Sequence, residues 1–289
     1  MFHNVLIGID GRQGGRDAIA LARQLAAPTA TFTLAHAYGI IVGKGAMEAA
    51  ALERDESREL LKRERALAGL TAELAVRGLR PVGRILHELA EERGADLLVV
   101  GSTRHALLGR VLLGDDCLAA LDGAPCAVAV APRGYAQAPF PLRRLSVGYN
   151  ESPESERALS AARALAREHD ATIHLHWVVS LEDLQGEKPI PADWPREVDE
   201  LIELHTERLT QLKGVHGVVI YGGPREELAQ AGQNFDLLIV GSRGYGPLGR
   251  LVHGSVSRYL ARHAPCPLLV LPRAAVPEPE PEELLAPQV

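Results

Sequence analysis

The sequence has few cysteines and no disulfide framework. Its only cysteines are Cys117, Cys126 and Cys266. An odd number without metal-ligand spacing excludes a small disulfide-stabilised scaffold and argues against a zinc site. Because Cys126 and Cys266 begin apolar, strand-like runs, we expect buried free thiols at these positions.

The sequence also lacks an excess of basic residues and any long apolar run. The formal net charge is -6 and the isoelectric point is near 6.0, so no basic surface for nucleic acid is expected. No apolar run approaches the roughly 18 residues that span a bilayer, and the chain does not begin with a basic and then apolar signal segment. These absences predict a cytoplasmic protein without membrane insertion.

The chain does contain an internal repeat with an interval of 140 residues. The repeated features are Asp96 and Asp236, Pro125-Cys126 and Pro265-Cys266, and Pro132 and Pro272. Each copy is large enough to bury its own core. We therefore expect an N-terminal domain over residues 1–135, a C-terminal domain over 142–273 and a proline-rich linker between them. Residues 274–289 have too little apolar surface to fold and are expected to be a disordered acidic tail.

In both copies, short apolar runs alternate with segments of helical periodicity. The first copy predicts strands at 5–9, 30–37, near Val82, at 97–100 and at 127–130, with helices around 18–25, 47–75 and 85–92. The second predicts strands at 145–149, 171–178, 217–221, 237–240 and 267–271. Its first helix should begin at Ser152-Pro153-Glu154, since serine caps, proline fits the first position and glutamate suits the positive end. Such alternation predicts an α/β fold with two tandem, open, parallel five-stranded sheets flanked by helices, which is a Rossmann-like arrangement.

A glycine-spaced turn follows one of these predicted strands. Gly241-Ser-Arg-Gly244 comes directly after the strand at 237–240, and Gly254-Ser255 should open the next helix. Glycines let backbone N–H groups approach an anion closely, and the start of a helix suits a phosphate. The turn therefore predicts phosphate binding at the carboxyl end of a central strand. The alternative is that these glycines only make a tight loop.

The pattern Gly241-x2-Gly244-x9-Gly254-Ser255, the strand order and the Pro-Cys-Pro before the last strand resemble the universal stress protein family over nearly the whole chain, twice. The resemblance implies an adenine-nucleotide α-hydrolase-like fold, whose ATP-binding members hold the phosphates on this turn and helix. The implied cofactor is ATP, ADP or AMP, with or without a bound Mg2+ ion. The implied binding residues are Asn150, Ser152, Val178, Val240, Gly241, Arg243, Gly244, Gly254, Ser255, Val256 and Ser257. Among these, the residues matching the positions that contact adenine are Asn150 and Val178.

Asn150 departs from the family's usual aspartate, which the first copy keeps as Asp10. An amide oxygen can still accept a hydrogen bond from an adenine amino group, but Asn150 can equally be a turn residue. Arg243, Arg250 and His253 can supply positive charge to a polyphosphate or be exposed loop charges.

The first copy carries a degenerate version of the glycine-spaced turn. Arg104 replaces the second glycine and Asp115 replaces the serine at the helix start. A carboxylate there would repel a phosphate and satisfy the N–H groups itself, so we predict that Asp115 is an N-cap and that this copy does not bind ATP in the family manner. Arg104 can pair with Asp115 or Asp116, or remain solvated.

The predicted function is ATP binding by the C-terminal domain, used to regulate an unknown protein partner in stress response or survival. One alternative is a nucleotide-independent scaffold, in which the two domains pair through their fifth strands and the chain can also form a homodimer. A second is a specialised ATP-using enzyme. Residues 10–14 and 150–154 do not match the Ser-Gly-Gly-x-Asp-Ser loop of ATP pyrophosphatases, and the P-loop motif GxxxxGK[ST] is absent. We therefore assign no catalytic residue and expect at most slow ATP hydrolysis or autophosphorylation. His174 and His176 lie on one strand face, but no partner cluster supports a metal site.

Overall fold

The computed structural model describes residues 1–38, 46–103, 106–180, 194–242 and 254–272, apart from the side chains at 46 and 115–117. Within these residues no helix is both long and apolar enough to cross a bilayer.

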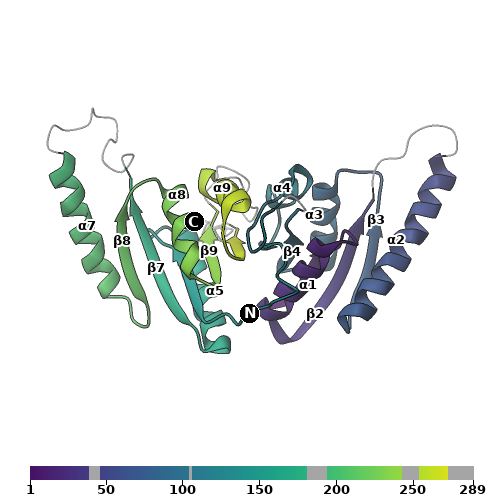
Figure 1. Cartoon of the computed structure of the whole chain (residues 1–289), viewed down its shortest axis with the longest axis horizontal. Helices are drawn as coiled ribbons and strands as arrows, with labels where there is room; N and C mark the ends of the chain where they lie inside the picture. Colours follow the sequence, from purple (N-terminus) through teal and green to yellow (C-terminus); the bar gives the residue numbers. More distant parts are fainter. Residues whose placement is uncertain (39–45, 104–105, 181–193, 243–253, 273–289) are drawn as a thin grey trace, which may run out of the picture.

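Strands and helices alternate along both copies (Figure 1). The elements of the first copy are β1 (Phe2–Gly8), α1 (Gln13–Leu25), β2 (Ala26–Ala37), α2 (Ala46–Ala68), β3 (Glu73–Arg77), α3 (Val82–Arg93), β4 (Leu97–Gly101), α4 (Asp115–Leu121) and β5 (Ala127–Ala131). Those of the second are β6 (Arg144–Gly148), α5 (Pro153–His169), β7 (Thr172–Val179), α7 (Trp194–Thr210), β8 (His216–Tyr221), α8 (Pro224–Ala231), a short 3-10 helix (Gly232–Asn234), β9 (Leu237–Gly241), α9 (Ser255–His263) and β10 (Leu268–Leu271).

The prediction of a third strand near Val82 is wrong, because Val82 begins α3 and the strand lies at Glu73–Arg77. The helix predicted over 47–75 ends early, at Ala68, where Gly69 adopts a positive φ of 55° that glycine tolerates. The next residues then pair with β2, for example Leu74 with Leu34. The predicted position is too late in the chain because the five residues of β3 begin with Glu73 and end with Arg77, so they do not form an apolar run.

The two copies share one ten-stranded sheet, in the order β3-β2-β1-β4-β5-β10-β9-β6-β7-β8. The five strands of each copy are parallel, whereas β5 and β10 run antiparallel, with Leu269 opposite Ala129. The α/β fold with two parallel five-stranded units is thus confirmed, and the units meet through their fifth strands. Both strands are completely buried, so pairing satisfies backbone groups that two separate sheets would leave on apolar edges.

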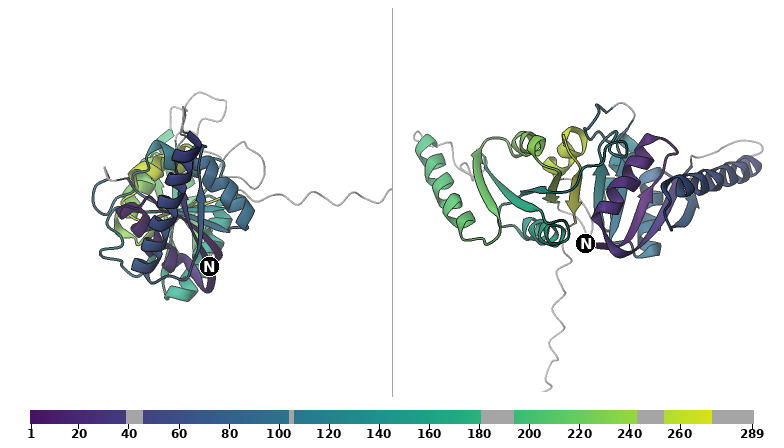
Figure 2. Two further views of the ribbon diagram at one scale, coloured as in Figure 1. Left: turned by 90° about the vertical axis from the view of Figure 1, so that its right-hand side faces the viewer. Right: turned by 60° about the horizontal axis from the view of Figure 1, so that its bottom comes forward.

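Helices cover both faces of the sheet (Figures 1 and 2). On one face, α1, α2, α5 and α7 contribute to a single apolar cluster that extends through both copies. On the other face, α3, α4, α8 and α9 contribute to a second cluster that is also shared. Each core is therefore continuous across the boundary between the copies.

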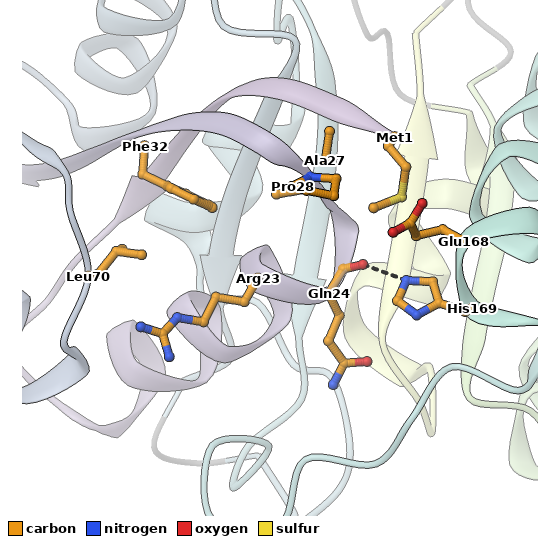
Figure 3. A pocket seen from close by; sticks show the side chains of 10 residues that line it. Met1, Arg23, Gln24, Ala27, Pro28, Phe32, Leu70, Glu168 and His169 are labelled. Atoms are coloured by element: carbon orange, nitrogen blue, oxygen red, sulfur yellow. Dashed lines mark hydrogen bonds between the residues drawn. The ribbon is translucent and has the colours of Figure 1, made fainter.

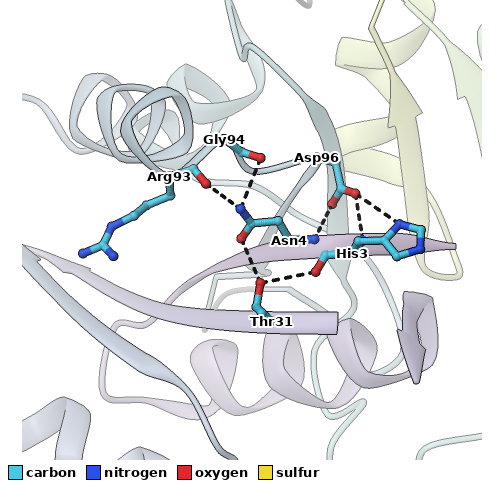
Figure 4. A network of polar contacts seen from close by, with 6 residues as sticks. All are labelled: His3, Asn4, Thr31, Arg93, Gly94 and Asp96. Atoms are coloured by element: carbon cyan, nitrogen blue, oxygen red, sulfur yellow. Dashed lines mark hydrogen bonds and ion pairs between the residues drawn. The ribbon is translucent and has the colours of Figure 1, made fainter. Parts of the chain in front are cut away.

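The repeated aspartates have the same structural role in each copy. The Asp96 carboxylate accepts hydrogen bonds from the N–H groups of His3 and Asn4, at 2.7 and 3.0 Å (Figure 4). The Asp236 carboxylate accepts from the N–H groups of Arg143 and Arg144, both at 2.8 Å. Each aspartate thus ties the residue before a central strand to the start of its neighbour.

Candidate functional site

The sheet order brings together the predicted residues that belong to different strands. β9, β6 and β7 are adjacent and parallel, so Gly241, Asn150 and Val178 all lie at or next to the same carboxyl edge. The helix after β6 covers one face of the sheet and the helix before β9 covers the other. This is a topological switch point, where open α/β sheets bind ligands.

The start of α9 completes this edge. Gly254 is the N-cap residue, in an extended conformation and without a capping side chain, and no acidic residue lies in the first turn. Ser255 is exposed and Val256 is half-buried against the second apolar cluster. In the described part of the chain, the N–H groups of this turn receive no side-chain cap, so they are suited to an external anion.

Ser257 differs from its neighbours in the predicted set. It is buried, and its hydroxyl donates to the Gly254 carbonyl oxygen at 3.2 Å. This bond holds the first turn of α9 together. Arg243 and Gly244, together with Arg250 and His253, lie outside the described residues.

The structure gives Gly241 a packing role. A Cβ added there would lie 2.5 Å from the carbonyl oxygen of Glu154 in the first turn of α5. At the equivalent position of the first copy, a Cβ on Gly101 would lie 1.9 Å from the Gly14 carbonyl oxygen. In both copies glycine therefore permits the first helix to approach the end of a central strand. Glu154 was missed as a neighbour because nothing local in the sequence signals this approach.

The side chains of Asn150 and Ser152 are hydrogen-bonded to each other. The Ser152 hydroxyl accepts from the Ser155 N–H at 3.3 Å and donates to the Asn150 Oδ1 atom at 2.7 Å. Ser152 is thus the predicted N-cap of α5, and Asn150 has the turn role that the sequence left open. Asp10 has a similar role in the first copy, accepting from the N–H groups of Arg12 and Gly15 at 2.9 and 3.1 Å.

Val178 and Val240 lie on the sheet face that α8 and α9 cover. Val240 is buried and Val178 is half-buried against the same apolar cluster. Val178 is therefore only partly enclosed by this cluster, whereas Val240 belongs to the core.

The first copy does not reproduce the predicted cap. Gly114 occupies the N-cap position of α4 and Asp115 is the first helical residue, so the prediction of Asp115 as the N-cap is wrong by one position. The glycine takes that position with an extended backbone, φ -72° and ψ 167°. The Asp115 and Asp116 side chains and Arg104 lie outside the described part, and with them the predicted ion pairs.

The two strand-face histidines pack against rings. His174 stacks on His216 with ring centroids 4.8 Å apart, and both His174 and His176 lie against Phe235. Among the described residues no three His, Cys, Asp or Glu side chains are arranged to hold a metal ion. His176 is buried and its Nδ1 atom has no hydrogen-bond partner within the described residues. Burial, with a smaller effect of His174, lowers the pKa of His176 to about 4.

Acidification should therefore destabilise the protein through His176. The unfolded chain binds a proton near pH 6.5 and the folded chain only near 4, so stability is full above 6.5 and is lost as the pH falls through this window. Between pH 7 and 5 we expect this effect to lower the free energy of unfolding by about 2 kcal/mol. His176→Leu should flatten the pH dependence of the urea-unfolding free energy between pH 7 and 5, whereas the exposed-site control His3→Gln should not. An unchanged profile in His176→Leu would contradict this assignment.

The described cysteines are buried free thiols, as predicted. Burial raises the pKa of both Cys126 and Cys266 to about 12, so neither is a thiolate near neutral pH.

A hollow of about 340 Å³ lies between the two copies (Figure 3). It is lined by the ends of α1 and α5, including Arg23, Glu168 and His169, and by Met1 and Phe32. There the His169 Nε2 atom forms a hydrogen bond of 2.7 Å with the Gln24 carbonyl oxygen. None of its lining residues belongs to the predicted nucleotide site.

Comparison with known proteins agrees with this architecture. A model of the universal stress protein family matches residues 1–132 and 141–272. A universal stress protein of Mycobacterium tuberculosis is 29% identical over 237 residues, covering 78% of this chain and 79% of its own. One of Mycolicibacterium smegmatis is 28% identical over 291 residues, covering 93% and 97%. The crystal structure of a universal stress protein from Archaeoglobus fulgidus has the same fold, with a TM-score of 0.64, 17% identity and coverage of 94% and 98%. The chain belongs to the universal stress protein family and carries two copies of its domain.

Proposed function

We propose that the C-terminal domain, residues 142–273, binds an adenine nucleotide, with its phosphates at the start of α9. The observation that carries this proposal is the first turn of α9, which has neither a side-chain cap nor an acidic residue and lies beside the carboxyl edge of the central strands. The positive end of a helix with free N–H groups stabilises phosphate oxygens.

α5, which follows β6 and also begins at this edge, is less suited to a phosphate. The first turn of α5 contains Glu154 and Glu156, and the Ser152 side chain already accepts from the Ser155 N–H group. Both features oppose an added negative charge. Electrostatics therefore favour α9 over α5 as the phosphate-binding helix.

The base of the nucleotide would lie against Val178 and Asn150, as the family resemblance implies. The Asn150 oxygen already accepts from Ser152, so its amide nitrogen is the atom left to donate to the base. Arg243 and Mg2+ would add positive charge near the phosphates. ATP, ADP and AMP share these features and are all candidates.

The bound nucleotide would set the conformation that a regulatory protein partner recognises in the cytoplasm during stress. The N-terminal domain, residues 1–135, would not bind nucleotide in this way. Any turnover would be slow hydrolysis or autophosphorylation.

The proposal predicts that adenine nucleotide is released from the purified protein and that ATP binding depends on the second turn alone. Gly244→Arg and Ser255→Asp, which copy the residues of the first turn, should each lower ATP affinity at least tenfold in calorimetry, because a bulky side chain or a carboxylate enters the phosphate position. Arg104→Gly, the matched control in the first copy, should leave the affinity unchanged. Unaltered ATP affinity in Gly244→Arg would show that the assignment is wrong.

The alternative of a nucleotide-independent scaffold also has structural support. The β5–β10 pairing and the two shared cores join the domains through protein contacts alone. Absence of nucleotide from the purified protein, together with no calorimetric ATP binding, would favour the scaffold.

A further inference from the structure

We propose that the first copy positions the nucleotide site of the second through its residues 106–114, a loop that precedes α4 and corresponds to the segment before α9 in the second copy. Val111 and Leu113 in this loop are the positioning residues, and α9 is the element that they hold. This inference rests on the proposed function, because it concerns the same start of α9.

The loop donates two hydrogen bonds to the far end of α9. The Val111 N–H donates to the Ala264 carbonyl oxygen at 2.8 Å, and the Leu113 N–H donates to the Ala261 carbonyl oxygen at 2.9 Å. The last carbonyls of a helix have no partner within the helix and are often satisfied by a left-handed glycine cap. α9 ends instead in an extended Ala264 followed by Pro265. The first copy therefore supplies donors that the local sequence does not.

Packing strengthens this connection. Val111 and Leu113 are 1% and 2% exposed, and they belong to the same apolar cluster as Leu260, Ala261 and Ala264. A displacement of the loop would break hydrogen bonds and open space in the core at once. The contact between this loop and α9 is therefore part of the buried core and not a contact at the protein surface.

The loop is equally well fixed within its own copy. The Thr103 N–H donates to the Leu112 carbonyl oxygen at 2.9 Å, and the Leu112 N–H donates to the Ser102 hydroxyl at 3.2 Å. That hydroxyl donates to the Ala131 carbonyl oxygen at 2.8 Å, at the end of β5. A series of hydrogen bonds therefore connects the paired fifth strands to the end of α9.

The geometry of α9 makes this contact relevant to the ligand. The helix has nine residues, so its ends are only about 13 Å apart. Such a short helix moves as one body: the loop holds one end, and the proposed phosphate site is the other. Loosening the loop contact should weaken binding, and by thermodynamic reciprocity ligand binding should strengthen the loop contact.

Two proline variants of the same loop test the inference by calorimetry with ATP. Val111→Pro removes the donor to Ala264 and should lower ATP affinity at least fivefold. Leu108→Pro is the matched control, because position 108 is the second residue of a type II turn, where proline is favoured. The turn is identified by the hydrogen bond from the Arg110 N–H group to the Leu107 carbonyl oxygen and by the φ of 75° at Gly109. Its ATP affinity should stay within twofold of the unsubstituted protein.

Hydrogen exchange on the unsubstituted chain gives a second measurement that does not depend on a variant folding. Saturating ATP should slow exchange of the Val111 and Leu113 amides at least threefold. The Gly109 amide, which donates to the Arg133 carbonyl oxygen within the first copy, should exchange at an unchanged rate.

The outcomes separate this inference from the proposed function. If the unsubstituted protein binds no ATP, both are overturned. If it binds ATP with equal affinity in folded Val111→Pro, or if Val111 and Leu113 exchange at the same rate with and without ATP, only the inference is overturned.

Discussion

Gly101→Ala should destabilise the protein by more than about 4 kcal/mol, above the usual cost of overpacking because the obstacle is backbone. The new Cβ would lie 1.9 Å from the carbonyl oxygen of Gly14 and 2.7 Å from its Cα atom. Neither atom can move aside by a change of rotamer, so β4 and α1 must separate. Since Val99 on β4 and Leu21 on α1 are fully buried in one cluster, that separation also opens the core.

The loss should be measured as the free energy of unfolding in urea. Gly114→Ala is the matched control, because Gly114 has a negative φ of -72° and the nearest obstacle to its Cβ is the end of the Thr103 side chain at 3.0 Å. The control should cost less than about 1 kcal/mol. Equal stability of the two variants would contradict the close approach of β4 and α1.

Asp17→Ala should cost about 3 to 5 kcal/mol, because it leaves buried donors without an acceptor. The Asp17 carboxylate is fully buried within α1 and accepts from the N–H groups of Gly134 and Ala136, both at 2.8 Å. It also accepts from the Gln13 side chain at 2.8 Å. The hydrogen bonds to Gly134 and Ala136 hold the end of the first copy and the start of the linker against α1.

This second loss can also be followed by urea unfolding and by proteolysis of the linker. Glu59→Ala is a suitable control, since the Glu59 side chain is 70% exposed and pairs only with the exposed Lys62 among the described contacts. It should change stability by less than about 0.5 kcal/mol. Resistance of the linker to protease in Asp17→Ala, equal to that of the control, would contradict this role for the carboxylate.

Several features of the fold could be predicted from local patterns alone. The start of α5 at Pro153 follows from the capping chemistry of Ser152, and Gly254 as the cap of α9 follows from the glycine-spaced turn. Uninterrupted aliphatic runs marked β4 and β9 because strands buried on both faces need apolar side chains on both. β3 was placed too late because its Glu73 and Arg77 ends break that pattern.

The sequence predicts which residues lie near the candidate site, but it does not predict which atoms they contact. The sequence placed Gly241 at the end of a strand, yet only the structure shows that Glu154 fills the space beside it. The sequence likewise treated Asn150 as a base-binding residue or a turn residue, and the structure directs its oxygen to Ser152. These contacts depend on how α5 packs against β9 and on side-chain orientation, which spacing does not encode.

By itself, the sequence determined the duplication and the alternation of strands and helices, because both follow from the order of residues along the chain. Only the tertiary structure decided that the two copies form one sheet, with Leu269 opposite Ala129, and that Val111 and Leu113 cap the end of α9. Both contacts join residues more than a hundred positions apart. Such pairings are selected by which edges and carbonyls remain unsatisfied once each copy has folded, and that is a property of the assembled molecule.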